Sequence, residues 1–305
     1  MSAVAVLALT AGTAVAAEPL VDTEWLNVNL QNDDLVVLDI RNAIDGGSAD
    51  LFAEGHIPGS LYSNYTRDGW RVAVDGIQGK LPPTDDVASL IGSLGIDNDD
   101  HIVVVPAGTS SSDFGSAARV YWTFKVLGHD EVSILEGGYA GWVDNGGEIA
   151  TGPAPENDTV EFAVDFQPDL LATTADVNAA IDQGNPPLID ARPVAHYTGE
   201  EVPGNIGVAG TLPGAFSLPH SELVLNDGQD VIDRDVLAEL LDQIDLTTEG
   251  EQIAFCNTGH WASVGWFLLS EVGGNPNVSM YDGSMAEWVA DDSRLVELSA
   301  NRTLN

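Results

Sequence analysis

The sequence predicts an α/β protein made of two similar domains, each with a mainly parallel β-sheet flanked by helices. The chain has 305 residues, which is long for one ordinary domain and sufficient for two domains that each bury a core. Short runs at residues 36–40, 102–105 and 132–135 are apolar apart from Asp39 and Ser133, as expected for strands covered on both faces of a sheet. Segments with helical periodicity separate these runs, which indicates parallel strands joined by helical crossovers.

An internal repeat supports the division into two domains. The segment VVLDIRN in the first half recurs as PLIDARP in the second half, so that Asp39 corresponds to Asp190. HIPGS and TLPGA correspond in the same way, as do the segments that end at Trp142 and Trp288. Because the order of these segments is the same in both halves, we expect the same order of strands and helices in each domain.

The polar, proline-containing segment TGPAPENDTV lies between the two copies and predicts a linker. We therefore expect a first domain over residues 18–152, a linker over residues 153–159 and a second domain over residues 160–305. Residues 1–17 are mostly apolar and end in small residues, the pattern of a signal peptide and its cleavage site, although no Lys or Arg precedes the apolar run. This pattern predicts a periplasmic or secreted protein with no membrane segment after processing.

Acidic side chains dominate the charge of the chain. There are 48 Asp and Glu against 10 Lys and Arg, which gives a formal net charge of -38. Such a chain repels nucleic-acid phosphates and anionic membranes, so neither is expected as a partner. A solvated surface explains the charge better than a specific cationic partner. The histidines and the single cysteine show no metal-ligand spacing, and no dinucleotide or phosphate-binding motif occurs, so no cofactor is predicted.

The single cysteine, Cys256, is the candidate nucleophile. It ends a predicted strand and opens the loop CNTGHW, which is followed by a segment with helical spacing. Ligands bind at the carboxyl edge of parallel sheets, and a helix N-terminus stabilises an anion such as a thiolate. Gly259 allows the loop to curl so that its amides point inward and hold a persulfide anion. The alternative is a buried cysteine that packs as a small hydrophobic residue.

These features together resemble the rhodanese family of sulfurtransferases over nearly the whole mature chain. The D-x-R element of that family occurs in each half, beginning at Asp39 and at Asp190, and its H-I-P-G element is intact at residues 56–59. A closing D-G-S-M-x-E-W segment spans residues 282–288. The active-site cysteine of the family opens a six-residue loop, as Cys256 does here. The resemblance therefore implies two rhodanese-like domains, of which the second is catalytic.

The resemblance also implies a mechanism. The Cys256 thiolate would attack the sulfane sulfur of a small anionic donor, and the persulfide would then pass its sulfur to a thiol or cyanide acceptor. The corresponding loop of the first domain, PAGTSSSDFG, has no cysteine, so it is expected to be catalytically silent and to close one wall of the active-site cleft. In an alternative interpretation this Ser- and Thr-rich loop is itself an anion site, although turn and helix-capping roles explain its composition better.

Three further residues take their expected roles from the resemblance. Arg192 would lie beside the catalytic loop and steady either the substrate or the loop, while Asp190 holds its guanidinium group. The alternative is a purely structural pair of Asp190 and Arg192. His196 occupies a position where two-domain relatives often carry a second arginine, which implies weaker, pH-dependent recognition of the donor's charge.

The loop residues bear on the choice of donor. Thiosulfate-type relatives tend to carry basic residues after the cysteine, whereas mercaptopyruvate-type relatives carry small neutral residues, as Asn257, Thr258 and Gly259 are. His260 and Trp261 follow neither pattern. His260 would either donate to the donor anion or cap the helix and face solvent, and Trp261 would shield the persulfide or narrow access to it. Because export favours thiosulfate over the cytosolic metabolite 3-mercaptopyruvate, thiosulfate is the predicted donor and 3-mercaptopyruvate the alternative.

Two other functions use some of the same features. Cysteine phosphatases also place a cysteine before a helix N-terminus, but they need a C-x5-R loop. The sixth residue after Cys256 is Ala262, so the phosphate-binding arginine is missing. A non-enzymatic persulfide carrier fits the sequence as well as an enzyme does, and steady-state turnover with a donor and an acceptor would separate the two.

Overall fold

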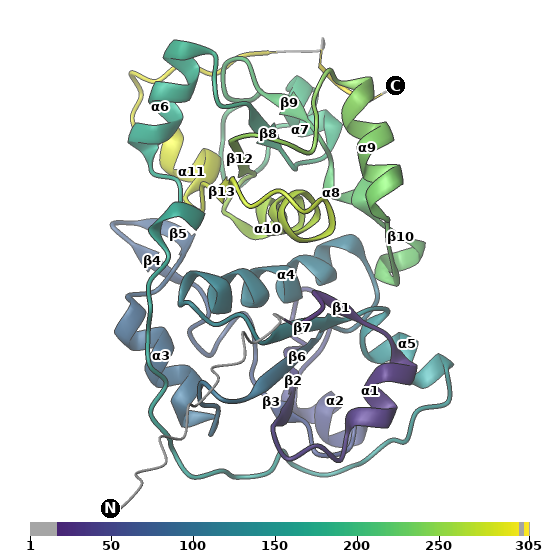
Figure 1. Cartoon of the computed structure of the whole chain (residues 1–305). Coiled ribbons are helices and arrows are strands. Elements are labelled where there is room, and N and C mark those ends of the chain that lie inside the picture. The colour runs from purple at the N-terminus through teal and green to yellow at the C-terminus, as the bar shows by residue number, and fades with distance from the viewer. Residues whose placement is uncertain (1–16, 299–301, 305) are drawn as a thin grey trace, which may run out of the picture.

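The two predicted α/β units are present in a computed structural model, which describes residues 17–298 and 302–304. Figure 1 shows the first half of the chain below the second half. The predicted signal peptide, residues 1–17, lies outside the described residues apart from Ala17. Within the described ranges, none of the helices combines the length and the apolar character that crossing a membrane requires.

The first unit contains a five-stranded sheet in which all neighbouring strands are parallel. The strand order is β1-β7-β6-β2-β3. The bounds of these strands are β1 (Leu20–Val21), β2 (Leu35–Asp39), β3 (Leu61–Tyr62), β6 (His101–Val105) and β7 (Val132–Leu135). The three strands predicted from apolar runs are therefore present to within one residue at each end. They are the three inner strands, which are covered on both faces, and this explains their mostly apolar sequences.

Helices cover both faces of the first sheet. They are α1 (Thr23–Asn29), α2 (Ala49–Glu54), α3 (Thr84–Ser93), α4 (Ser111–Val126) and α5 (Gly138–Asp144). Ile102 and Val104 of β6 belong to the core that contains residues of α3 and α4. Val103 and Val105 belong to the opposite core, with Trp142 of α5. Successive side chains of the strand thus alternate between two apolar faces.

The second unit repeats this arrangement with a four-stranded parallel sheet of order β13-β12-β8-β9. Its strands are β8 (Leu188–Asp190), β9 (Phe216–Ser217), β12 (Gln252–Phe255) and β13 (Val278–Met280). The α-helices are α6 (Thr174–Gln183), α7 (Val194–Thr198), α8 (His220–Leu223), α9 (Arg234–Gln243), α10 (His260–Phe267) and α11 (Ser284–Trp288). The remaining elements are the 3₁₀ turns η1 (Pro168–Leu170) and η2 (Asn226–Gly228), the π-helical turn η3 (Leu268–Val272), and the antiparallel pair β10 (Val224–Leu225) and β11 (Asp230–Val231).

Parallel strands bring their carboxyl ends to one edge of each sheet. In the second sheet, β12 pairs with β8 so that Phe255 lies opposite Asp190. In the first sheet, β6 pairs with β2 so that Val105 lies opposite Asp39. The residue that follows Phe255 is Cys256, and it therefore occupies the same place in the second unit as the residue after Val105 does in the first.

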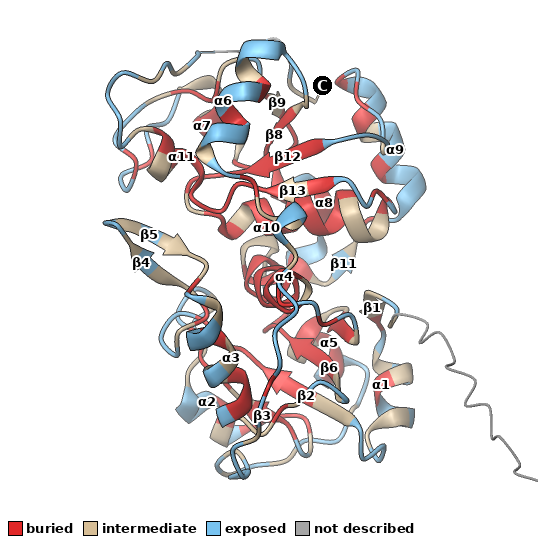
Figure 2. Ribbon diagram, turned by 60° about the vertical axis from the view of Figure 1, so that its left-hand side comes forward, coloured by how far each residue is buried: buried red, intermediate tan, exposed pale blue. Residues whose placement is uncertain are grey.

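The two units share a continuous apolar core. Helices α4 and α10 lie side by side between the two sheets (Figure 1), and both are almost entirely buried (Figure 2). The ring of Phe267 in α10 packs edge-on against Tyr121 of α4, with ring centroids 5.0 Å apart, and against Phe114 at 5.6 Å. Buried aromatic contacts of this kind hold the units together, so residues of the first unit can complete a site that is built on the second.

A hairpin of the first unit also reaches the second unit. Its strands are β4 (Val72–Val74) and β5 (Ile77–Lys80), and Figure 1 shows β5 beside α11. Lys80 forms an ion pair with Asp282 at 3.1 Å and another with Glu287. The first unit therefore contacts the second at two separate places, through α4 against α10 and through the hairpin beside α11.

The connection between the units stays on the first unit beyond the predicted linker. Residues 153–167 contain no helix or strand. The backbone N–H groups of Val160 and Gln167 donate to carbonyl groups of Gly92 and Val126 in the first unit. The chain leaves the first unit only at η1, where the second unit begins.

Candidate active site

Cys256 follows β12 directly and lies at the carboxyl edge of the second sheet. Helix α10 begins at His260, within the six-residue loop predicted to follow the strand, so that Gly259 is the residue before the helix. Cys256 is 1% exposed and belongs to the shared core, yet it also lines a cavity of about 390 Å³. The thiol is therefore both packed in place and open to a small ligand.

Residues from both units line this cavity. The first unit contributes Ile44 and Arg71, and the second contributes Cys256, a segment at residues 203–205, and the side chains of His196, Glu201, Asn257, Thr258, His260 and Trp261. Five of the predicted site residues are thus brought together with the cysteine. Arg192 and Gly259 do not line the cavity; Gly259 is part of the loop, and Arg192 contacts the loop through Asn257.

Ser284 holds the loop against the end of α11. Its hydroxyl group accepts hydrogen bonds from the N–H groups of Cys256 at 3.0 Å and Gly259 at 3.1 Å, and it donates to the carbonyl group of Tyr281 at 2.8 Å. The hydroxyl oxygen lies 4.0 Å from the sulfur of Cys256. One side chain therefore fixes both ends of the short loop that carries the nucleophile.

Gly259 has a φ of +73°, in the left-handed region that favours glycine. A Cβ atom there would lie 2.5 Å from the guanidinium group of Arg119 and 2.5 Å from the carbonyl oxygen of Asp282. No side chain fits without displacing one of these groups. The glycine predicted to let the loop curl is required both by its backbone angle and by this close approach.

A charged network from the first unit supports the other side of the loop. Arg119 of α4 is fully buried and donates to the carbonyl group of Gly259 at 3.0 Å and to the carboxylate of Asp282 at 3.3 Å. Asp282 also accepts from the N–H group of Leu81 at 2.6 Å and pairs with Lys80. Burial lowers the pKa of Arg119, and the Asp282 carboxylate opposes that shift.

His260 is buried, and the first unit engages both of its ring nitrogens. Nε2 lies 2.8 Å from the carbonyl oxygen of Ser112, which only accepts, so Nε2 carries the proton. Nδ1 lies 3.0 Å from the hydroxyl group of Tyr65 and accepts from it. Burial and the nearby Arg71 lower the pKa of His260 to about 3, so the ring is neutral at neutral pH. His260 is therefore a bridge between the units, which corrects both predicted alternatives, donation to the donor anion and exposure to solvent.

Trp261 forms a wall of the cavity. Its ring stacks on His220, with centroids 4.6 Å apart and planes at 9°, and its indole N–H donates to the Ser112 hydroxyl group at 3.0 Å. Burial and the neighbouring His196 lower the pKa of His220 to about 4, so this ring is also neutral at neutral pH. The stack and the hydrogen bond hold the indole in one position beside the thiol.

Comparison with protein families gives a match in each unit. Residues 22–145 and 173–291 both match the model described as Rhodanese-like domain, and the two matches together span most of the chain. The chain belongs to the rhodanese family. Its fold is accordingly that of two rhodanese domains, as the resemblance implied.

The similar proteins of this rhodanese are sulfurtransferases. A protein of Haloferax volcanii, provisionally named a thiosulfate sulfurtransferase, is 31% identical over 90% of this chain and 94% of its own. A protein of Saccharopolyspora erythraea with the same name is 30% identical over 89% of this chain and 93% of its own. The crystal structure of the 3-mercaptopyruvate sulfotransferase of Escherichia coli, 27% identical, superposes with a TM-score of 0.76 over 88% of this chain and 99% of that one. This rhodanese is a sulfurtransferase.

Arg192 is buried beside the catalytic loop of the rhodanese. Its guanidinium group donates to the carboxylate of Asp190 at 2.6 to 3.1 Å and to the carbonyl group of Gly210 at 2.8 Å. Its remaining nitrogen, Nη1, lies 3.4 Å from the side-chain oxygen of Asn257. All three nitrogens therefore have protein partners, and Arg192 steadies the loop. Of the two predicted roles, this position supports the one toward the loop and corrects the one toward the substrate.

His196 has one ring nitrogen without a partner. The residue is 9% exposed, and Nε2 lies 3.7 Å from the carboxylate of Glu201. Nδ1 is buried and has no hydrogen-bond partner among the described residues. A buried polar atom in the wall of a cavity is a group that a bound ligand can satisfy. Contact of His196 with the donor stays a prediction, and its unpartnered Nδ1 is the atom available for it.

The corresponding loop of the first domain holds a carboxyl group of its own. The N–H groups of Ala107, Gly108 and Thr109 donate to the side chain of Asp113 at 3.1, 2.6 and 3.1 Å. Asp113 belongs to α4 and fills the place where successive amides would otherwise hold a free anion. The alternative in which this loop is an anion site is therefore corrected, because an internal carboxyl group already occupies it.

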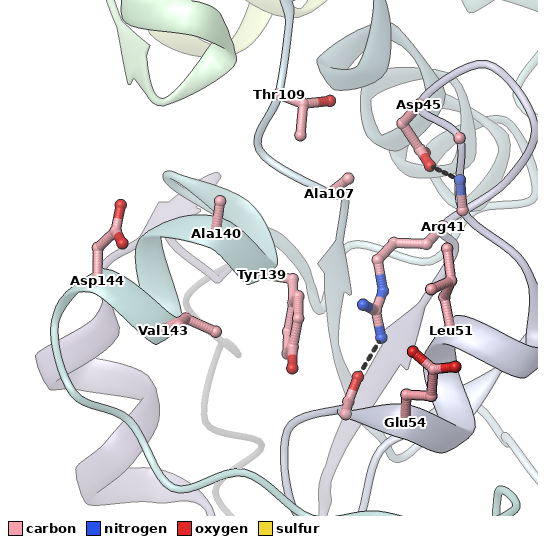
Figure 3. Close-up of a pocket in the computed structure, with 13 residues that line it drawn as sticks. Arg41, Asp45, Leu51, Glu54, Ala107, Thr109, Tyr139, Ala140, Val143 and Asp144 are labelled. Atoms are coloured by element: carbon pink, nitrogen blue, oxygen red, sulfur yellow. Dashed lines mark hydrogen bonds between the residues drawn. The ribbon is translucent and has the colours of Figure 1, made fainter.

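A cavity of about 520 Å³ lies at the same edge of the first sheet (Figure 3). Arg41, the counterpart of Arg192, is in its wall, paired with Asp39 at 2.8 Å and donating to the carbonyl group of Gly55 at 2.7 Å. Its guanidinium group lies 3.9 Å from the centre of the Tyr139 ring. The arrangement repeats the surroundings of the catalytic loop, but the chain's single cysteine is in the other domain.

Asp113 and Asp45 are two carboxyl groups in contact with each other. Burial and the neighbouring Asp45 raise the pKa of Asp113 from 3.8 to about 7, and burial also raises the pKa of Asp45. Between about pH 4 and pH 7 the folded chain therefore holds a proton that the unfolded chain has lost. The stability from this proton is complete below about pH 4 and is lost as the pH rises through about 7.

Replacing Asp45 with asparagine is expected to remove this dependence. The amide N–H would donate to Asp113 at every pH, and the amide oxygen would still accept from the N–H groups of Asn42 and Gly47. We expect Asp45→Asn to raise the free energy of unfolding by about 1 kcal/mol at pH 8 and to leave it nearly unchanged at pH 5. Thermal unfolding at both pH values measures this, and an equal effect at both would contradict the shared proton.

Sequence reasoning missed several residues of the site, among them Tyr65, Arg71, Arg119 and Ser284. Ser284 stood within the D-G-S-M segment, but its role depends on the turn that follows β13. The other three come from the first domain and reach the loop only through the packing of the domains. The composition held one signal for Arg71 and Arg119. The chain has only 10 Lys and Arg against 48 acidic residues, so each basic side chain is a candidate for a specific ion pair or ligand contact.

Proposed function

We propose that this sulfurtransferase takes its sulfur from thiosulfate and carries it as a persulfide on Cys256. The Cys256 thiolate forms a bond to the outer sulfur of thiosulfate, and the sulfur–sulfur bond of the donor breaks, so that sulfite leaves with the electron pair. A nucleophilic acceptor then bonds to the terminal sulfur and restores the thiolate. Cyanide would leave as thiocyanate, and a thiol would leave as its persulfide.

The cavity beside Cys256 is the observation that carries this proposal. At this cavity a nucleophilic sulfur, a loop before a helix N-terminus and one unsatisfied polar atom, Nδ1 of His196, lie together. Thiosulfate fits a cavity of about 390 Å³ easily. The two relatives at 30% and 31% identity both bear the name of a thiosulfate sulfurtransferase, which favours this donor over 3-mercaptopyruvate.

We also propose that the protein acts outside the cytoplasm. The apolar residues 1–17, which end in small residues, support export. In an oxidising compartment a lone cysteine has no intramolecular partner for a disulfide, so Cys256 stays available as a thiol. Fractionation of the native host, with the mature N-terminus determined by mass spectrometry, tests this, and a cytoplasmic protein with residues 1–17 intact would contradict it.

Mass spectrometry of the whole protein after incubation with thiosulfate tests the donor. We expect an addition of about 32 Da that maps to the Cys256 peptide and disappears on treatment with cyanide. Labelling by 3-mercaptopyruvate with none by thiosulfate would reverse the choice of donor. Steady-state turnover with thiosulfate and cyanide distinguishes an enzyme from a persulfide carrier, because a carrier is labelled without turning over rapidly.

A further inference from the structure

The catalytic domain offers little positive charge to an anionic donor. The loop residues Asn257 and Thr258 are neutral, and His260 is neutral with both ring nitrogens engaged. Arg192 is committed to Asp190 and to the loop, and it does not line the cavity. The second domain also contributes a carboxylate, Glu201, to the lining. A donor that is a small anion therefore needs a cation from elsewhere.

Arg71 of the first domain lines the cavity. It is partly buried just before β4, and its Nε donates to the carbonyl group of Gly79 at 3.2 Å. Its Nη2 donates to the carbonyl group of Thr258 and lies 3.2 Å from the Thr258 hydroxyl group. A further side-chain hydrogen bond joins the guanidinium group to Tyr65. These contacts fix Arg71 against the catalytic loop, and the residue lines the cavity beside Cys256.

The surroundings of Arg71 keep it in this position. The carbonyl oxygens of Gly79 and Thr258 come from the hairpin of the first domain and from the catalytic loop of the second, so the arginine is held by both domains. Its guanidinium group also lies 5.7 Å from the centre of the Tyr65 ring. Because a fixed guanidinium loses little freedom when it binds an anion, this geometry favours a charge-assisted hydrogen bond to the donor.

We propose that Arg71 is the residue that binds the anionic group of the sulfur donor. The first domain would then bind the charge of the donor, and Cys256 of the second domain would react with its sulfur. The ligand class is a small sulfur compound with an oxyanion, such as the sulfonate end of thiosulfate. His196 provides a second polar contact through its unpartnered Nδ1. This inference rests on the proposed function for the identity of the donor, but the position of the cation can be tested without any donor.

Alkylation of Cys256 by two matched reagents tests the charge directly. Iodoacetate and iodoacetamide both form a carbon–sulfur bond with the thiolate and release iodide, but only iodoacetate is an anion. Because Cys256 is the only cysteine, each rate reports on this site alone. In Arg71→Gln we expect the ratio of the iodoacetate rate to the iodoacetamide rate to fall roughly tenfold or more. Arg71→Lys should keep part of the ratio, since it keeps the charge.

Arg67→Gln is the matched control. Arg67 lies in the same segment and carries the same charge, but it is exposed and does not line the cavity. Its alkylation ratio should equal that of the parent protein. A distorted loop in Arg71→Gln would slow both reagents together and leave the ratio unchanged, and an unchanged ratio would overturn the proposal.

Transfer kinetics supply a second readout. In a two-step transfer, kcat/KM for the donor and kcat/KM for the acceptor report on separate half-reactions. We expect Arg71→Gln to lower kcat/KM for thiosulfate roughly tenfold or more and to leave kcat/KM for a neutral thiol acceptor, dithiothreitol, nearly unchanged. Equal losses in both constants would contradict a role in donor binding. If the parent protein does not react with thiosulfate at all, the proposed donor is wrong, while the alkylation ratio still decides the role of Arg71.

Discussion

Replacing Cys256 with serine is expected to abolish sulfur transfer while the protein remains folded. A serine hydroxyl group is not ionised at neutral pH and does not carry sulfane sulfur as a stable persulfide, so the first half-reaction has no nucleophile. We expect turnover with thiosulfate and cyanide to fall by about a thousandfold or more. Serine is close to cysteine in size, and its main-chain N–H still donates to the Ser284 hydroxyl group. Circular dichroism and thermal unfolding should therefore match those of the parent protein.

The outcome is decisive because the sequence contains one cysteine. No second thiol is available to accept the sulfur in the variant, and the first domain has a proline, Pro106, at the position that matches Cys256. Cys256→Ala serves as a second inactive form that lacks any hydroxyl group. Transfer retained by either variant would mean that sulfur passes through another group, and the persulfide mechanism would be wrong.

The fold was predictable because it depends on patterns that are local in the sequence. The inner strands are covered on both faces, so the sequence of each is a short, mostly apolar run. The strand Val132–Leu135 begins and ends at the same residues as the run that predicted it. The duplicated D-x-R segments gave the correspondence between Asp39 and Asp190, and these residues do lie at equivalent positions opposite β6 and β12. A repeat of this kind requires no knowledge of how the two units pack.

The surroundings of the thiol were less predictable because they depend on contacts between distant residues. Tyr65 and His260 are separated by 195 positions in the sequence, yet their side chains share a hydrogen bond. The ring of His260 is neutral and fully engaged because Ser112 of α4 and Tyr65 of the first unit both pack against the start of α10, which no local pattern encodes. The choice between the two predicted roles of Arg192 needed the structure for a related reason, since the carbonyl group of Gly210 and the side chain of Asn257 accept from its guanidinium group.

Removing the carboxylate of Asp282 is expected to cause the largest loss of stability of any single change discussed. Asp282 is 1% exposed and is the carboxylate paired with the fully buried Arg119, which would be left as an uncompensated buried charge. The N–H group of Leu81 would also lose its acceptor. We expect Asp282→Ala to lower the free energy of unfolding by about 3–5 kcal/mol. Urea unfolding followed by tryptophan fluorescence measures the loss.

A control on the protein surface separates burial from charge. Asp291 also pairs with an arginine, Arg294, at 3.6 Å, but its side chain is 48% exposed. Asp291→Ala removes the same type of group from the same domain. It is expected to leave the midpoint of urea unfolding nearly unchanged, because water replaces the lost partner. A comparable loss in both variants would show that the effect at Asp282 does not come from a buried pair.

Combining Asp282→Ala with Arg119→Met tests the pair itself. If most of the loss in Asp282→Ala comes from stranding a buried guanidinium, then removing that guanidinium should recover part of it, and the double variant should be more stable than the sum of the two single changes predicts by about 1–3 kcal/mol. Additive losses would mean that each residue acts through other partners, such as the carbonyl group of Gly259. Because Arg119 comes from α4 and Asp282 follows β13, coupling between them would also demonstrate in solution that the first domain supports the loop that carries Cys256.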